Sequence, residues 1–216
     1  MIKGIIFDLD GTLLYTLDDL TDALNLALEE YGFRQLSVQE VKANIGNGVS
    51  RLVKDSLPDD VDEETFKKAL ERNKENYNRL YLNKTKPYQG ISETLQTIQN
   101  KGIKIALNTN KAQLLSENLM KNIFPEINFI KVVGDDFVSP KKPDPSGVYK
   151  ILETFELNKD EVIYVGDSAQ DMLTAYNAGI KSIGCLWGFR DRKTLEENNA
   201  TYIINKPEEI LNYLGD

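Results

Sequence analysis

The sequence predicts an α/β fold, a doubly wound parallel sheet (Rossmann-like) core with an inserted all-helical domain. The first observation is Met1 to Phe7, a short isoleucine-rich run typical of a strand buried on both faces of a parallel sheet. The second is the alternation of strand and helix patterns after about residue 84, which implies parallel strands joined by helices. The third is the segment between them, which carries only helical patterns. A core with a smaller inserted unit also suits a chain of 216 residues.

These patterns place the domain boundaries. We expect residues 1–14 and 84–216 to form the core and residues 15–83 to form the helical insertion. After the first strand, the core strands are expected at about residues 103–107, 129–133, 161–165, 181–186 and 201–204.

The insertion is predicted to contain four helices. In the first, apolar residues recur at helical spacing from Leu17 to Tyr31. Thr16 followed by Asp19 has the spacing of a capping box, which predicts where this helix begins. The other three are expected at about residues 38–43, 49–56 and 61–81.

Charge and composition exclude several classes of partner. A net charge of −8 and a pI near 4.8 argue against a nucleic-acid surface or an anionic membrane surface, both of which need clustered Lys and Arg. We find no signal segment and no apolar run long enough to span a membrane, so we expect a cytoplasmic protein, monomeric or homodimeric. Cys185 is the only cysteine, which rules out a disulfide within the chain and suits a reducing compartment.

The chain contains no histidine. A histidine general base, a Ser-His-Asp triad and a histidine-ligated zinc are therefore impossible. Acid, base and metal-binding roles fall to carboxylates and lysine.

The first strand ends in two acids. Asp8 and Asp10 are two residues apart and point the same way if the strand continues, which is costly unless a cation or proton compensates. The expected compensator is a hard divalent metal ion. Gly11 allows backbone angles that other residues avoid, and Thr12 offers a hydroxyl. The alternative is a solvated Asp-Gly turn.

Other predicted strands also end in polar residues. They are Thr109-Asn110, Lys142 in a Lys-Pro loop, and Gly166-Asp167-Ser168 with Asp171 one helical turn later. Taken singly, these could be a turn, a solvated lysine and a helix cap. The carboxyl ends of parallel strands meet at one edge of a sheet, where ligands bind. These polar residues are therefore more informative together, in this order, than any one of them alone.

With these residues in place, the sequence resembles the haloacid dehalogenase superfamily of phosphatases over essentially its whole length. The four motifs of that family are present in order as Asp8-Leu9-Asp10-Gly11-Thr12, Thr109-Asn110, Lys142-Pro143 and Gly166-Asp167-Ser168-Ala169-Gln170-Asp171. The helical insertion resembles the cap of the subgroup that includes phosphoglycolate phosphatases. Tyr15 departs from that subgroup, whose members usually carry Asp there.

The resemblance implies a role for each motif residue. Asp8 would be the nucleophile that forms an aspartyl-phosphate, and Asp10 the general acid and base. The phosphate would be held by Gly11, Thr12, Thr109, Asn110 and Lys142, with Lys142 also part of the catalytic set. Mg²⁺ would be bound by Asp8, Asp10 through its carbonyl oxygen, and Asp167, with Asp171 in support.

The resemblance also implies a specificity loop in the cap. Its residues would be the turn Gly46-Asn47-Gly48 and Arg51 shortly after it. Arg51 could pair with a carboxylate or second phosphate of the substrate, since guanidinium binds both in a bidentate manner. The alternative is that Arg51 is a solvated charge on a helix.

These motifs point to a Mg²⁺-dependent phosphatase acting on a small phosphorylated metabolite. Asp10 argues against a dehalogenase, which lacks that second acid. A pyrophosphatase or a 5′-nucleotidase of the same superfamily remains open, because the motifs do not select the leaving group. A non-catalytic phosphate-binding module is a further alternative. A phospho-receiver signalling module would usually be about half this length and lack the helical insertion.

Overall fold

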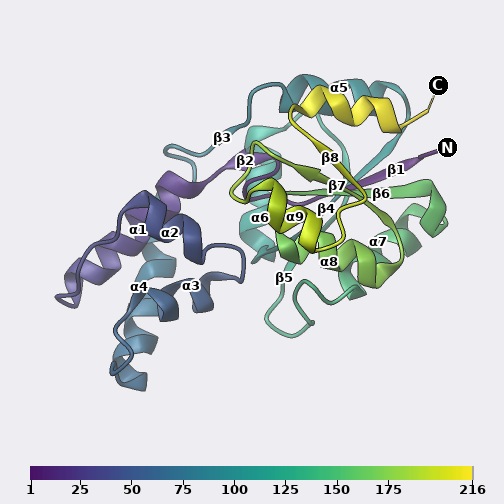
Figure 1. The fold of residues 1–216 in the computed structure, drawn as a ribbon. Coiled ribbons are helices and arrows are strands. Elements are labelled where there is room, and N and C mark those ends of the chain that lie inside the picture. The colour runs from purple at the N-terminus through teal and green to yellow at the C-terminus, as the bar shows by residue number, and fades with distance from the viewer. Residues whose placement is uncertain (216) are drawn as a thin grey trace. The chain divides into compact units, whose positions relative to one another are not determined.

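The chain forms two compact units, shown in Figure 1. The structure is a computed structural model and describes residues 1–215. One unit, here called the core unit, consists of Met1–Leu14 and the chain from Pro87 onward. The other, the helical unit, is Tyr15–Lys86. The two linking segments, β2 (Leu14–Tyr15) and β3 (Lys86–Pro87), form a small two-stranded sheet.

The core unit contains a six-stranded parallel sheet in the order β5-β4-β1-β6-β7-β8. The predicted α/β fold class is therefore confirmed. The strands are β1 (Gly4–Phe7), β4 (Lys104–Ala112), β5 (Phe129–Asp135), β6 (Val162–Gly166), β7 (Lys181–Cys185) and β8 (Tyr202–Ile204).

The register of the central strands determines which residues meet at the carboxyl edge. Phe7 at the end of β1 pairs with Leu107 of β4 on one side and Val165 of β6 on the other. The residues that follow these three positions therefore emerge together. This alignment brings Asp8 and the end of β6 to one point of the sheet.

Strand β4 is longer than the sequence predicts. It continues past Leu107 through Thr109 and Asn110 to Ala112, because its far end pairs with Asp135 of β5 across an irregularity in the ladder. Thr109 and Asn110 thus lie on the strand itself rather than just after its end, and the alternative of a turn at this place is not what the structure shows.

Helices cover both faces of this sheet, with α5 on one side and α7 and α8 on the other (Figure 1). Under α7 and α8, Ile6, Ala106 and Tyr164 from the three central strands pack with Val148 and Phe155 in a buried cluster. The core unit's helices are α5 (Ile91–Asn100), α6 (Gln113–Ile123), α7 (Ser146–Phe155), α8 (Ala169–Ala178) and α9 (Arg192–Glu197), with 3-10 turns η1 (Lys159–Glu161) and η2 (Pro207–Tyr213).

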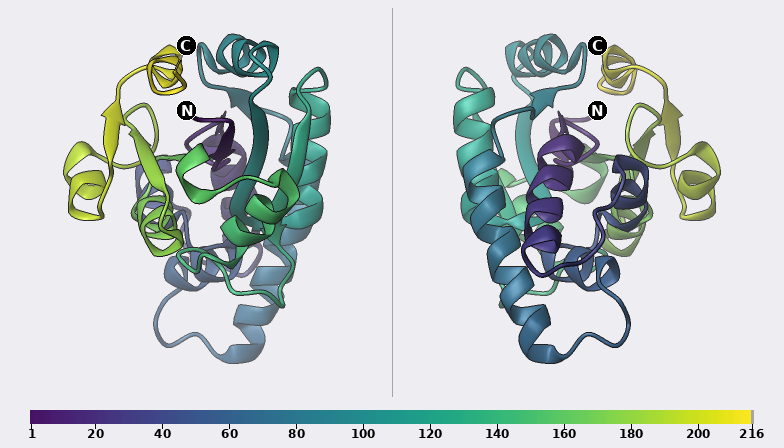
Figure 2. Two further views of the ribbon diagram at one scale, coloured as in Figure 1. Left: turned by 90° about the vertical axis from the view of Figure 1, so that its right-hand side faces the viewer. Right: turned by 90° about the vertical axis from the view of Figure 1, so that its left-hand side faces the viewer.

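The helical unit has four helices, all at the predicted places. They are α1 (Leu17–Glu30), α2 (Val38–Asn44), α3 (Val49–Ser56) and α4 (Glu63–Leu80). The two long helices, α1 and α4, lie side by side in the right-hand view of Figure 2 and contact each other more extensively than any other pair of helices in the unit. Buried Leu24 and Leu28 of α1 and Ala69 and Tyr77 of α4 form apolar faces of this pair.

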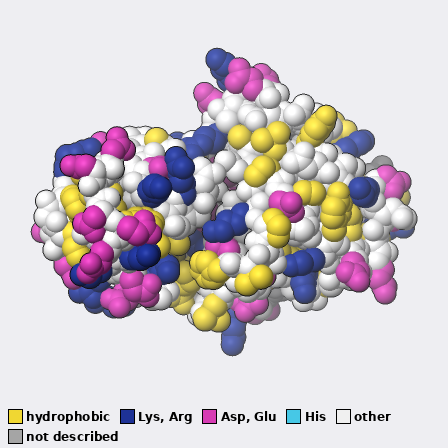
Figure 3. Space-filling model, turned by 90° about the horizontal axis from the view of Figure 1, so that it is seen from below, with side chains coloured by type: hydrophobic (Ala, Val, Ile, Leu, Met, Phe, Trp, Pro, Cys, Tyr) yellow, Lys and Arg dark blue, Asp and Glu magenta, His cyan; other side chains and the backbone are white. Residues whose placement is uncertain are grey.

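Acidic and basic side chains alternate over the face of the molecule in Figure 3. Many of them form exposed ion pairs one helical turn apart, such as Lys68 with Glu64 and Arg51 with Asp55. Pairs of this kind contribute little to stability. Within residues 1–215, every helix is too short or too polar to cross a bilayer.

The predicted capping box at the start of α1 is wrong. The Thr16 side chain makes no capping hydrogen bond, and Asp19 turns toward the two residues that precede β3 instead. The fully buried Asp19 carboxylate accepts hydrogen bonds from the backbone N–H groups of Lys84, at 2.9 and 3.0 Å, and Thr85, at 2.8 Å. The partner of Asp19 is 65 residues away, so local spacing could not indicate it, and this contact replaces the predicted cap.

This contact predicts a stability difference between two aspartates of the same helix. Asp19→Ala leaves two backbone donors without an acceptor and should lower the free energy of unfolding by about 1–3 kcal/mol. Asp22 pairs only with the exposed Lys84 ammonium, so Asp22→Ala should have a much smaller effect. Urea unfolding of both variants measures this, and equal losses would contradict the role given to Asp19.

Candidate active site

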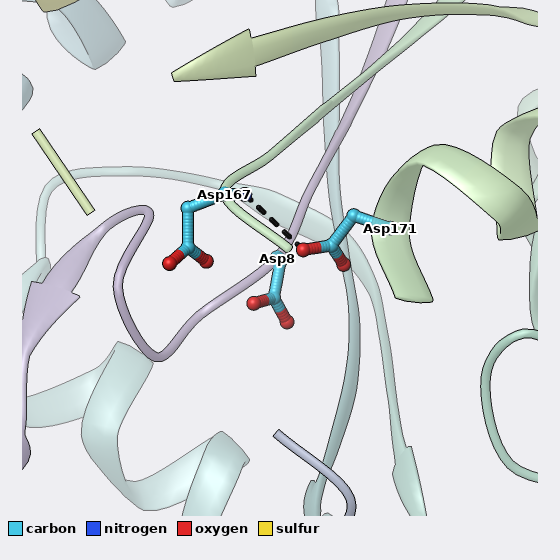
Figure 4. A group of neighbouring side chains, drawn as sticks. All are labelled: Asp8, Asp167 and Asp171. Atoms are coloured by element: carbon cyan, nitrogen blue, oxygen red, sulfur yellow. Dashed lines mark hydrogen bonds between the residues drawn. The ribbon is translucent and has the colours of Figure 1, made fainter. Parts of the chain in front are cut away.

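Three buried aspartates meet at the carboxyl edge of the sheet (Figure 4). Asp8 follows β1, Asp167 follows β6, and Asp171 lies in the first turn of α8. Their exposed fractions are 6%, 1% and 0%, and one carboxylate oxygen from each lies within 4.8 Å of the others. Burying three like charges together is unfavourable without a compensating cation.

Lys142 supplies one positive charge to this cluster. Its buried ammonium lies 2.7 Å from Asp8 Oδ1 and 2.6 Å from Asp171 Oδ1. The Asn110 side chain holds the backbone of Lys142 on both sides, accepting from its N–H at 2.9 Å and donating to its carbonyl at 3.3 Å. Asn110, predicted to bind phosphate, thus positions the lysine.

Asp171 has both carboxylate oxygens engaged by the protein. Oδ1 contacts Lys142, while Oδ2 accepts from the Ser168 hydroxyl at 2.6 Å and from the backbone N–H groups of Ser168 at 3.0 Å and Asp167 at 3.1 Å. Ser168 caps α8 through its side chain. Asp171 is therefore tied to the lysine and to the loop that carries Asp167.

Asp167 is enclosed by the chain on three sides. Its Oδ2 accepts from Phe189 N–H at 2.7 Å, and its Oδ1 accepts from the Thr12 hydroxyl at 3.3 Å. A Cβ at Gly11 or Gly188 would lie only 2.3 Å from atoms of Asp167, which is why both positions are glycine. Thr12 is fully buried and its hydroxyl orients this carboxylate, while its expected contact with phosphate stays a prediction.

Gly11 departs from its expected role as well. Its N–H, predicted to face a phosphate, donates to Leu14 O at 2.9 Å within the turn after β1. That turn also requires a positive φ of 89° at Gly11. The sequence correctly indicated an unusual turn at Gly11, but the Gly11 N–H is used in the hydrogen bond that closes this turn.

Burial and mutual repulsion perturb the ionisation of these groups. Burial, followed by the charge of Asp171, raises the pKa of Asp8 to about 7, and Lys142 opposes this rise. Burial and the charges of Asp171 and Asp8 also raise the pKa of Asp167 well above its ordinary value. Burial works against the charge on Lys142, yet Asp171 and Asp8 raise its pKa well above the ordinary value. The carboxylates thus exceed the single ammonium, and a divalent cation at this point would restore the balance.

Asp10 lies beside this cluster and is bound by a lysine that motif reasoning missed. Lys111 Nζ is 3.0 Å from both carboxylate oxygens of Asp10. Lys111 stands two residues after Thr109 on β4, so alternation along a strand was the signal that could have placed it at the site. Thr109 is itself buried beside it and accepts the Lys111 N–H at 3.3 Å.

Tyr164 is a second residue that sequence reasoning missed. It is fully buried in β6, and its hydroxyl donates to Asn108 O at 2.9 Å and lies 3.4 Å from Asp171 Oδ1. In the sequence, Tyr164 looks like an ordinary apolar residue of a strand. Its hydroxyl nevertheless links the end of β4 to the acidic cluster.

The remaining predicted site residues belong to the helical unit. Gly46 and Gly48 both have positive φ, at 118° and 84°, on either side of Asn47, and they form the turn before α3. Arg51 follows on α3, where its Nε donates to Asp55 at 2.7 Å. Their role in binding a substrate stays a prediction.

The chain matches the family model of haloacid dehalogenase-like hydrolases over residues 5–185. A phosphoglycolate phosphatase of Nitrosospira multiformis is 34% identical over 208 residues, covering 94% of this chain and 91% of that protein. A phosphoglycolate phosphatase of Neisseria meningitidis is 31% identical over 216 residues, covering 97% of this chain and 92% of that protein.

Solved structures show the same likeness. The crystal structure of a predicted phosphoglycolate phosphatase from Haemophilus somnus superimposes with a TM-score of 0.93 at 26% identity, covering 99% of this chain and 98% of that one. These matches confirm the resemblance read from the four motifs. The chain belongs to the haloacid dehalogenase-like hydrolase family.

Proposed function

We propose that this protein is a Mg²⁺-dependent phosphatase that hydrolyses a small phosphomonoester through an aspartyl-phosphate on Asp8. The observation that carries the proposal is the buried group of Asp8, Asp167 and Asp171, which contacts one buried ammonium among residues 1–215, that of Lys142. The phosphatases among the chain's relatives support the reaction class. Their named substrate makes 2-phosphoglycolate the first candidate.

The proposed metal ligands are Asp8, the Asp10 carbonyl oxygen and Asp167, with Asp171 in support. Mg²⁺ prefers oxygen ligands at about 2.1 Å, so two opposite ligands are about 4.2 Å apart. The carboxylate oxygens of the three clustered aspartates already lie within 4.8 Å of one another. Asp171 contacts the Lys142 ammonium through one oxygen and accepts three hydrogen bonds from Asp167 and Ser168 through the other, so we assign it to holding Lys142 and the Asp167 loop. When bound, the ion would neutralise Asp8 and draw charge from a phosphate oxygen.

Asp8 is the proposed nucleophile. Its backbone N–H is bound to Val165 O at 2.9 Å, and its Oδ1 lies 2.7 Å from Lys142, so its side chain is fixed at the end of β1. In the first step Asp8 forms a bond to phosphorus while the bond to the leaving oxygen breaks. In the second step water attacks the same phosphorus and releases Asp8.

Asp10 is the proposed general acid and base. It would give a proton to the leaving oxygen in the first step and take one from water in the second, a role worth roughly 10²–10⁴-fold in rate. Its side chain is partly exposed, at 18%, which suits a group that must meet both an alcohol and water.

Lys142 and Thr109 are proposed to bind the phosphoryl group. Positive and donor groups around its oxygens stabilise the charge that develops during transfer. Since Gly11 N–H is bound within its turn, the backbone N–H groups of Leu9 and Asp10, which have no acceptor among residues 1–215, are better placed to complete this site.

The first test measures phosphate release from 2-phosphoglycolate, pyrophosphate, sugar phosphates and nucleotides, with Mg²⁺ or EDTA. We expect release that EDTA abolishes and that falls at least about 10³-fold in Asp8→Asn, because the nucleophile is lost. Asp160→Asn, an exposed aspartate of η1 before the other end of β6, is the matched control and should keep full activity. Release only from pyrophosphate or from nucleotides would name the alternative substrate class. No release from any of them would favour a non-catalytic phosphate-binding module.

A second prediction concerns the metal-free protein. The folded-state pKa of Asp8, about 7, exceeds the ordinary value of 3.8. Below about pH 4 Asp8 is protonated in both states, and above about pH 7 only the folded state holds a buried charge. In EDTA, stability should therefore fall as pH rises from about 4 to 7, and the fall should be smaller in Asp8→Asn.

A surface aspartate gives the control for this measurement. Hydrogen bonds from Ser139 lower the pKa of the exposed Asp136 to about 2, so Asp136→Asn should leave the slope between pH 4 and 7 unchanged. Chemical unfolding at several pH values measures all three proteins. An equal slope in wild type and Asp8→Asn would show that Asp8 is charged at low pH, contrary to the burial argument.

A further inference from the structure

Lys111 is buried against the proposed acid and base of the reaction. Only 6% of its side chain is exposed, and its ammonium lies 3.0 Å from both oxygens of Asp10. The two residues come from neighbouring strands, since Asp10 follows β1 and Lys111 lies on the extended end of β4. The contact is therefore built by the sheet and lies wholly within the core unit.

The geometry of this pair restricts the Asp10 carboxylate. The terminal torsion of an aspartate is broad, so an isolated carboxylate rotates readily. An ammonium at equal distance from both oxygens opposes that rotation, because turning the carboxylate lengthens one of two charge-assisted hydrogen bonds.

We propose that Lys111 is a positioning residue that holds the Asp10 carboxylate in the orientation required for proton transfer to and from the reacting oxygen. This inference rests on the proposed phosphatase function. Lys111 itself forms no bond to the substrate. The proton passes from Asp10 to the leaving oxygen as the bond between that oxygen and phosphorus breaks, and from water to Asp10 as the bond between Asp8 and phosphorus breaks.

The position of Lys111 in the sequence fits this role. Lys111 follows Thr109 by two residues on the extended end of β4, where the ladder with β5 is irregular. One lies at the proposed phosphate site and the other reaches the proposed acid. A lysine is long enough to span from β4 to the turn after β1, and its ammonium presents donors to both carboxylate oxygens.

The test uses the dependence of the reaction on its leaving group. A p-nitrophenolate leaves without a proton, whereas an alkoxide needs one, so only the alkyl ester depends on a well-oriented Asp10 in the first step. The quantity to compare is kcat/KM for p-nitrophenyl phosphate and for the best alkyl phosphomonoester of the wild-type protein. For each ester, kcat/KM reports the first chemical step and is independent of the later hydrolysis of the aspartyl-phosphate.

We expect Lys111→Met to lower kcat/KM about 100-fold for the alkyl ester and less than about 10-fold for p-nitrophenyl phosphate. Because Asp10 also serves in the second step, p-nitrophenolate should appear as a burst in this variant. Lys111→Arg, which keeps two donors for a carboxylate, should recover part of the loss. Lys3→Met is the control, since Lys3 forms an exposed ion pair with Glu161 at the opposite end of β1.

A double variant tests whether Lys111 acts through Asp10. Lys111→Met should add less than about threefold to the loss caused by Asp10→Asn, because residues that act as one unit are not additive. Melting temperatures of all variants show whether they fold, and Lys111→Gln replaces Lys111→Met if the latter does not.

Three results would overturn the inference while wild-type turnover leaves the phosphatase proposal intact. They are an equal loss on both esters, a rise in KM alone, which would make Lys111 a substrate-binding residue, and full additivity with Asp10→Asn. A wild-type protein that hydrolyses neither ester would instead overturn the proposed function itself.

Discussion

The ion pairs of Lys142 are the contacts on which the site depends. One ammonium lies between Asp8 and Asp171 at 2.7 and 2.6 Å, in a place that water hardly reaches. Removing one partner of such a buried group leaves an uncompensated charge, which is far costlier than losing a surface pair. Neighbouring side chains hold both partners in place. The Asn110 side chain is hydrogen-bonded to the backbone of Lys142, and the Tyr164 hydroxyl lies beside Asp171.

The same cluster explains how a chain with a net charge of −8 could hold the proposed phosphate. The three aspartates are not solvated surface acids. Backbone N–H groups, hydroxyls and one lysine fix them in place, and their charge exceeds what those groups balance. An excess of this kind is a binding site for a cation, and a bound cation reverses the local field toward anions. The acidity of the chain as a whole therefore says little about the sign of charge that a substrate meets at this edge of the sheet.

Much of this arrangement is predictable because it follows from local pattern. The apolar runs gave the strands, their polar ends gave the acidic cluster and Lys142, and the helical spacing gave α1 to α4. Contacts that local pattern does not indicate depend on partners distant in sequence. Asp19 bonds to Lys84 and Thr85 rather than capping its own helix, and the Thr12 hydroxyl donates to Asp167. Lys111 was missed because its partner Asp10 lies 101 residues away and because the strand that carries it was predicted to end at about residue 107.

The absence of histidine gives the Asp10 and Lys111 pair its significance. A histidine general base brings its own orientation, because one ring nitrogen can be held while the other acts. The two oxygens of an aspartate carboxylate lie on one carbon and rotate together, so the side chain has no separate atom by which it can be held. In this chain the orienting group must come from outside the acid, and β4 provides it two residues beyond Thr109. One strand thus supplies both a proposed phosphate contact and a support for the proton-transfer group, and the unusual length of β4 is what allows it to do both.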